Sequence, residues 1–168
     1  DVDKMTIKVK RAIESASIMG VEIIVVHPLQ HMDYTTNVKV FRDMNIEYYK
    51  MLGNLGQKFG IKIAVENMFQ TDKTTGKIKD STCASWQEFC EYLDTVNSSN
   101  VVGCLDIGHC RLCGREPGDM LMHMGAERIK CFHVHDNDGV KDCHAIPYTR
   151  SLNWDEICKA IALSGYSG

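Results

Sequence analysis

Hydrophobic residues gather in four short runs along the chain, and these runs predict buried β-strands. The runs are Glu22–His27, Ile61–Glu66, Val101–Asp106 and Ile129–His135. Each consists mostly of β-branched or other apolar residues, without a clean alternation of apolar and polar positions. Parallel strands that are covered on both faces have this pattern.

The segments between the runs carry apolar residues at helical spacing. The apolar faces of the predicted helices are Met5–Met19, Phe41–Phe59, Phe89–Val96, Leu121–Met124 and Ile157–Ile161. Gly20 and Gly60 follow the first two faces, as glycines that end helices do. Ser85 and Glu88 form a capping box ahead of the third, and Pro117 suits the first turn of the fourth.

Strands and helices alternate throughout this interpretation, which predicts an α/β fold on a parallel sheet. Thr71–Asp80 is the one long polar loop that it leaves. The length suits a single domain over residues 1–168. A content of 44% hydrophobic and 24% charged residues excludes disordered and fibrous proteins. No apolar run approaches the roughly 20 residues of a membrane helix. Because the chain begins with Asp1 and not Met, we expect a piece of a longer protein.

Charge and cysteine content narrow the expected partners and compartment. The 19 Lys and Arg residues against 22 Asp and Glu residues give a net charge of −3, which argues against nucleic acid as a partner. Several of the eight cysteines lie in apolar runs or helical patterns, where free cysteine behaves as a small buried hydrophobe. This favours a reduced, cytoplasmic protein. Cys110 and Cys113 form a C-x-x-C pair without a second pair, which argues against a structural zinc.

The residue that terminates each apolar run is the most informative feature of the sequence. His27, Glu66, Asp106 and His133 occupy these positions. The carboxyl ends of parallel strands converge on one rim of a sheet or barrel. For any one of these residues alone, a helix cap or a backbone contact is the ordinary role. As a set, imidazoles and carboxylates predict a site for a divalent metal such as Mn, Zn or Fe.

Further polar residues follow the last two strand ends. They are His109, His135, Asp136, Asp142 and His144. In a continuing extended strand His135 points the same way as His133, whereas a strand that ends at His133 leaves the loop to aim it elsewhere. His31 and His123 have no comparable context and receive no role.

At this point the residues carry a family resemblance. The matching pieces are Val25–Pro28 (VVHP), Ala64–Asn67 (AVEN), Val102–His109 (VGCLDIGH), Ile129–Asn137 (IKCFHVHDN), Asp142–His144 (DCH) and Leu152–Gly168. From Val21 onward the chain resembles the sugar phosphate isomerase/epimerase superfamily, which has a xylose isomerase-like TIM barrel and also includes endonuclease IV-type enzymes. The resemblance implies an incomplete (β/α)8 barrel, with about four parallel strands that correspond to strands four to seven of eight.

The resemblance also implies a site and a reaction. Glu66, Asp106 and His133 would bind a divalent metal (Mn, Zn, Mg or Co), and the fourth usual ligand, a glutamate ending strand eight, is absent. Glu66 would also move a proton during isomerisation or epimerisation of a sugar or sugar phosphate. His109 matches a residue that contacts a substrate oxygen.

Other residues of the rim would complete the substrate site. His27, Asp142 and His144 would line it, and Arg150 would hold a phosphate or carboxylate unless it simply faces solvent. The family often follows its Asp-x-His with Pro-Gly-x-Gly, whereas this chain has Ile146–Arg150 (IPYTR).

Two rival functions remain open on the sequence. An endonuclease IV-like zinc phosphodiesterase acting on abasic DNA has histidines and aspartates at the places of His27, His109, Asp142 and His144. The acidic balance and the lack of a basic glycine-rich loop after His144 argue against it. The other rival is a non-catalytic module on the same scaffold. Four strands leave two open edges, which another chain or a second copy in a homo-oligomer would cover. We therefore expect the 168-residue chain alone to be inactive.

Overall fold

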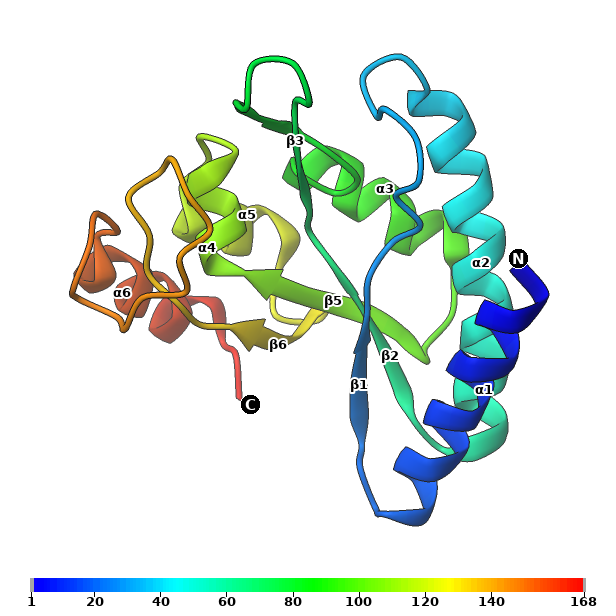
Figure 1. Cartoon of the computed structure of the whole chain (residues 1–168). Helices are drawn as coiled ribbons and strands as arrows, with labels where there is room; N and C mark the ends of the chain where they lie inside the picture. The colour runs from blue at the N-terminus through cyan, green and yellow to red at the C-terminus, as the bar shows by residue number, and fades with distance from the viewer. Residues whose placement is uncertain (1, 168) are drawn as a thin grey trace.

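A curved sheet of four parallel strands organises the protein, whose residues 2–167 are described by the computed structural model (Figure 1). The strands are β1 (Ile23–Val26), β2 (Lys62–Glu66), β5 (Val101–Asp106) and β6 (Ile129–His133), in the order β1-β2-β5-β6. Every pairing within this sheet is parallel. The predicted α/β class is therefore confirmed, and each of the four apolar runs contains a strand. The last strand ends at His133 and not at the predicted His135.

Six helices accompany the described strands. They are α1 (Val2–Ile18), α2 (Val38–Phe59), α3 (Trp86–Val96), α4 (Ile107–Leu112), α5 (Pro117–Met124) and α6 (Trp154–Ser164). The helices α2 and α3 pack on the sheet, and α5 packs on α6. Figure 1 shows the helices along the outside of the curved sheet, an arrangement that gives half of a barrel.

The predicted strict alternation of strand and helix is wrong in two places. The predicted polar loop Thr71–Asp80 instead forms most of an antiparallel hairpin, whose strands are β3 (Phe69–Thr71) and β4 (Ile78–Asp80). Its turn is held by Asp72, whose carboxylate accepts hydrogen bonds from the backbone N–H groups of Thr74 and Thr75. The second place is after β5, where the two helices α4 and α5 follow one strand. The short helix α4 begins directly after β5, because Asp106 ends the strand and caps the helix.

The predicted capping box at α3 is half formed. Ser85 Oγ accepts the hydrogen bond from the Glu88 N–H, as predicted. The Glu88 carboxylate, however, accepts hydrogen bonds from the Tyr34 hydroxyl at 2.6 Å and the Cys83 N–H at 2.9 Å. Glu88 therefore ties the loop before α2 to the start of α3 and does not reach back to Ser85.

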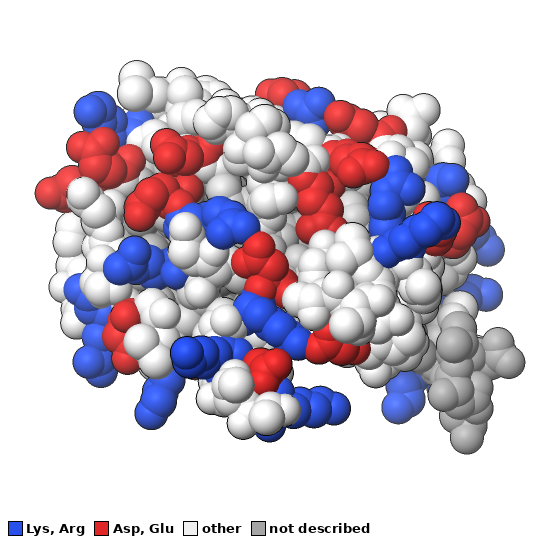
Figure 2. Space-filling view, turned by 90° about the horizontal axis from the view of Figure 1, so that it is seen from above, with Lys and Arg blue, Asp and Glu red and all other residues white. Residues whose placement is uncertain are grey.

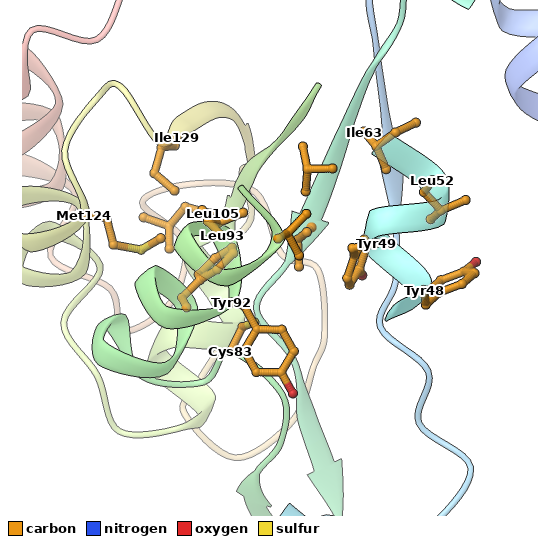
Figure 3. Packing of buried hydrophobic residues seen from close by; sticks show 14 of the residues in the cluster. Tyr48, Tyr49, Leu52, Ile63, Cys83, Tyr92, Leu93, Leu105, Met124 and Ile129 are labelled. Atoms are coloured by element: carbon orange, nitrogen blue, oxygen red, sulfur yellow. The ribbon is translucent and has the colours of Figure 1, made fainter. Parts of the chain in front are cut away.

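The main core lies between the sheet and the helices (Figure 3). Leu52 of α2 and Ile63 of β2 are both completely buried there, and such side chains each contribute about 1.5–3 kcal/mol. A Cβ on Gly56 of α2 would lie 2.5 Å from the carbonyl oxygen of Ile61. Glycine at this position lets the helix approach the strand closely enough to bury this core.

The opposite face of the sheet carries smaller residues. Ala64, Val102 and Cys104 are buried there and pack against half-buried residues of the edge strands β1 and β6. All eight cysteines are free thiols. Among the described residues, no helix combines the length and the apolar character needed to cross a bilayer.

Candidate metal centre

The four strand ends place polar side chains at one end of the sheet. Glu66, Asp106 and His133 are the last residues of β2, β5 and β6, and His27 follows β1 directly. Ligand atoms of Glu66, Asp106 and His133 all lie within 4.8 Å of one another. The predicted convergence of these three residues is therefore present in the structure. This set of side chains is called the strand-end centre below.

Imidazole rings surround the carboxylates of the strand-end centre. His133 Nδ1 lies 3.0 Å from Glu66 Oε1 and 3.4 Å from Asp106 Oδ2. His27 Nε2 lies 3.0 Å from Glu66 Oε2. Glu66 and Asp106 are each only 1% exposed, whereas His133 and His27 border solvent. The carboxylates are therefore reached from the side of the two histidines.

Charge in the strand-end centre is balanced by protons on histidine. The hydrogen bond to Asp106 and the nearby Glu66 carboxylate raise the pKa of His133 to about 9. The close contact with the Glu66 carboxylate raises the pKa of His27. Burial works to raise the pKa of Asp106, but the His133 hydrogen bond and the neighbouring imidazoles lower it overall. Two buried carboxylates thus attract positive charge to one point.

A divalent metal fits this arrangement. Glu66 Oε2 is buried and makes no hydrogen bond among the described residues, although His27 lies close to it. A buried carboxylate oxygen without a hydrogen bond is costly unless a cation satisfies it. Two carboxylates and an imidazole are a donor set typical of Mn, Fe and Zn sites. The residues present therefore suit a metal that replaces the proton on His133.

A second group of side chains lies behind Asp106. His109 Nε2 is 3.7 Å and His144 Nε2 is 3.2 Å from Asp142 Oδ2. The ring of His135 stacks on that of His144, with centroids 4.1 Å apart. His135, Asp142 and His144 meet the spacing for a metal, as do Asp106, His109 and His135. The structure thus brings the predicted residues His109, Asp142 and His144 beside the strand-end centre.

The loop that carries Asp142 and His144 is anchored by Asp136. The completely buried Asp136 carboxylate accepts four hydrogen bonds, at 2.9–3.1 Å. The donors are the N–H groups of Asn137, Arg150 and Leu152 and the indole of Trp154. Of the predicted Arg150, only the backbone N–H takes part in these contacts, and its side chain is exposed.

Asn67 was not predicted as a site residue, and His135 was noted in the polar cluster without a role. Asn67 Oδ1 accepts the Asp106 N–H at 2.7 Å, and its backbone oxygen accepts a hydrogen bond from His109 Nδ1 at 2.9 Å. The proton of His109 is therefore on Nδ1, which leaves Nε2 facing Asp142. His135 contacts Asp106 as well. The position of Asn67 directly after a strand end was the available signal.

A cavity of about 470 Å³ lies between the β1–α2 loop and the β3–β4 hairpin. Phe69 lines it and also packs edge-on against the ring of His109, with centroids 4.9 Å apart. The cavity walls include Asp33, Asp72 and Lys79, and Lys79 contacts both carboxylates. The space next to the site is therefore polar, with little unbalanced charge.

Comparisons with known proteins place these features in context. The family model described as xylose isomerase-like TIM barrel matches residues 2–168. The curated protein MJ1311 of Methanocaldococcus jannaschii is 29% identical over 171 residues, which cover 99% of this chain and 56% of that protein. Protein y4fM of Sinorhizobium fredii is 44% identical over 71 residues, 41% of this chain and 22% of that protein. The match thus spans little more than half of MJ1311 and about a fifth of y4fM.

Solved structures give the same picture. A D-tagatose 3-epimerase-like protein superposes with a TM-score of 0.84 at 25% identity and covers 99% of this chain and 61% of its own. The IOLI protein, solved with a binding zinc atom, has a TM-score of 0.78 at 21% identity over 99% of this chain and 58% of its own. D-psicose 3-epimerase from Clostridium cellulolyticum H10, solved with D-tagatose, has a TM-score of 0.72 at 16% identity, covering 95% and 52%.

Proposed function

The chain belongs to the xylose isomerase-like TIM barrel family. We propose that it is the part of a metal-dependent sugar or sugar-phosphate isomerase or epimerase that contains the strand-end centre. The observation that carries this proposal is the convergence of Glu66, Asp106 and His133 within 4.8 Å at the ends of three parallel strands. The similarity to a D-tagatose 3-epimerase-like protein, to a D-psicose 3-epimerase solved with D-tagatose and to the IOLI protein solved with a zinc atom supports it.

Glu66, Asp106 and His133 would hold the metal. When bound, the metal would polarise the substrate carbonyl and stabilise negative charge that develops on its oxygen. Glu66 would take the proton from the carbon beside the carbonyl, because its carboxylate contacts His27 and His133, whose rings border solvent. His109 donates its Nδ1 proton in a hydrogen bond to the Asn67 backbone oxygen, so its Nε2 is available to a substrate hydroxyl. His27, Asp142 and His144 border the same space.

Glu66→Gln in the full-length protein tests this function. A panel of ketoses, aldoses and their phosphates is assayed for isomers, after removal of metal by a chelator and again after addition of Mn²⁺, Zn²⁺, Mg²⁺ or Co²⁺. We expect turnover only with metal, and a loss of about 10²–10⁴ in rate for Glu66→Gln. Glu47→Gln, on the exposed face of α2, is the matched control. Unchanged turnover in Glu66→Gln would disprove the assignment.

The 168-residue chain alone should be inactive. Proton transfer across a substrate needs an acid and a base on opposite faces, and among the described residues we assign this task to Glu66 alone, without a second group across from it. Further chain or a second copy beside β1 and β6 would complete the wall around the substrate. The free thiols suit a reducing compartment such as the cytoplasm.

A zinc phosphodiesterase acting on abasic DNA is the second candidate. The observation in its favour is the group His109, Asp142 and His144, which adds a further set of metal-competent side chains beside the strand-end centre. Figure 2, which shows the molecule from above relative to Figure 1, has Lys and Arg interspersed with Asp and Glu on this face. A surface that binds duplex DNA needs excess positive charge, so we prefer the sugar substrate.

A further inference from the structure

We infer that His135 is a positioning residue that holds the Asp106 carboxylate in the orientation needed to bind the metal, and that Gly108 exists to make room for it. The inference rests on the proposed function, because it concerns the geometry of the same metal site. Four observations on His135 carry it: its hydrogen bond, its burial, its contact with Gly108 and its packing between two other rings.

The hydrogen bond from His135 leaves one oxygen of the Asp106 carboxylate bound to donors of the protein and the other available to the metal. His135 Nε2 lies 3.0 Å from Asp106 Oδ1 and 3.3 Å from Oδ2. Oδ1 also accepts the His109 N–H at 2.7 Å. Oδ2 lies 3.4 Å from His133 Nδ1. Two donors therefore hold Oδ1 from one side, and Oδ2 is presented to the strand-end centre.

The end of β6 explains how two histidines reach one carboxylate. His133 is the last residue of the strand and contacts Glu66. Because the strand stops there, His135 lies outside it, is only 5% exposed and has its Nε2 nearest to Asp106 Oδ1. His133 approaches the other oxygen, Oδ2, so the two imidazoles contact the same carboxylate at different atoms.

The close contact between Gly108 and His135 indicates that the position beside Asp106 accommodates an imidazole ring. A Cβ on Gly108 would lie 2.5 Å from each ring nitrogen of His135 and closer still to Cε1. The φ of Gly108 is not positive, so backbone conformation does not require glycine at this position. The three atoms nearest to that Cβ all belong to the ring of His135, so this ring requires glycine at position 108.

Neighbouring rings fix the plane of the His135 imidazole. It stacks on His144 with an interplanar angle of 6° and meets the edge of His109 at 79°. His135 Nδ1 is buried and has no hydrogen-bond partner among the described residues. The contact with a carboxylate requires the proton on Nε2, so the ring directs its hydrogen bond to Asp106. Groups of this kind behind a metal ligand typically change metal affinity by about 10–100-fold.

Three variants of the full-length protein test the inference through the affinity for Zn²⁺ and Mn²⁺, measured by competition with a chromophoric chelator. His135→Phe keeps a ring but loses the donor, so affinity should fall about 10–100-fold. His135→Gln places an amide N–H near the position of Nε2, so it should bind close to wild type. Gly108→Ala should weaken binding like His135→Phe, although every ligand is retained. His123→Phe, exposed on α5, is the control.

Each outcome has one meaning. Wild-type affinity in His135→Phe would show that the ring only fills space, and this would overturn the inference. Equal losses in His135→Gln and His135→Phe would make His135 a direct ligand, which also overturns it. A wild-type protein that binds neither metal refutes the proposed function, and the inference with it. Thermal unfolding of each variant without metal identifies any loss that comes from misfolding, and His135→Gln then decides the question.

Discussion

At the scale of single residues, the ion-pair contacts of the two buried carboxylates at the strand-end centre are with imidazoles. No Lys or Arg forms an ion pair with Glu66 or Asp106 in the part of the chain that the structure describes. A lysine would fix the charge permanently, whereas an imidazole gives up its proton near neutral pH. A metal can therefore take the place of protons without rearrangement of the fold.

The first prediction concerns the pH dependence of metal binding. The pKa of His133 is raised to about 9, so its proton must leave before Nδ1 can bind a metal. The apparent affinity should rise about tenfold per pH unit toward pH 9 and then level off. Titrations with Zn²⁺ at several pH values measure this slope, and His133→Gln should flatten it. An affinity independent of pH in the wild-type protein would contradict the assignment.

The same shift predicts the opposite trend for the metal-free protein. A group whose pKa is raised in the folded state stabilises the fold fully below its ordinary pKa, which is 6.5 for His133. That stabilisation is lost as the pH rises through about 9. The midpoint of urea unfolding without metal should therefore fall between pH 6.5 and pH 9 in the wild type, more steeply than in His133→Gln.

The residues at the strand ends were predictable, and their neighbours were not. Glu66, Asp106 and His133 end apolar runs, and parallel strands bring such ends together whatever the details of the helices. The direction of His135 depends on whether β6 stops at His133, and a shift of two residues at a strand end lies within the ordinary uncertainty of such boundaries. Arg150 was singled out for its charge, but only its backbone N–H contributes to the loop contacts.

At the scale of elements, the loop from β6 to α6 depends on one side chain. Asp136 and Ala145 exchange two backbone hydrogen bonds, and the Asp136 carboxylate collects four more from this segment and α6. These contacts hold the segment that presents Asp142 and His144. This role could not be predicted from the sequence, where Asp136 is one more polar residue in the cluster.

Asp136→Ala should therefore destabilise the protein and release this loop. The substitution leaves buried N–H groups without acceptors, and the free energy of unfolding should fall by about 3 kcal/mol. Urea unfolding measures the loss, and hydrogen exchange should show faster exchange over residues 137–152. Asp138→Ala is the control, because the exposed Asp138 accepts hydrogen bonds only from Val140 and Lys141 within its own turn. Equal effects of the two variants would refute the special role of Asp136.

The β3–β4 hairpin shows why the helices and main strands were predictable while this element was not. Each of its strands has three residues, too few for an alternation of apolar and polar positions to be recognised. The hairpin is fixed by tertiary contacts. Gln70 bonds to the backbone of Met32 and Tyr34, and Lys79 contacts Asp33. Such contacts to the β1–α2 loop are invisible in the local sequence.

At the scale of the whole molecule, metal binding should stabilise the folded state. The ligands come from three strands that only the folded sheet brings together, so a metal binds the native state in preference to the unfolded chain. At a free metal concentration of about 100 times Kd the stabilisation is about 2.7 kcal/mol, which raises Tm by about 5–10 °C. Differential scanning calorimetry with and without Zn²⁺ measures the shift, and Asp106→Asn should abolish most of it. A shift that survives in Asp106→Asn would place the metal elsewhere.

The surface charge of the molecule predicts which of the two candidate substrates, a sugar or abasic DNA, the protein binds. The net charge is −3, and several cations near the rim are already committed to carboxylates. Arg115 lies 2.6 Å from Asp80, and Arg111 lies 3.9 Å from Glu116.

We therefore expect no tight binding of the full-length protein to an abasic DNA duplex at physiological salt, measured by fluorescence anisotropy against an undamaged duplex of the same length. A protein that contacts six or more phosphates loses affinity by about 10³ or more between 50 and 200 mM salt. Nanomolar binding to the abasic duplex with such a steep salt dependence would overturn the sugar substrate in favour of the phosphodiesterase.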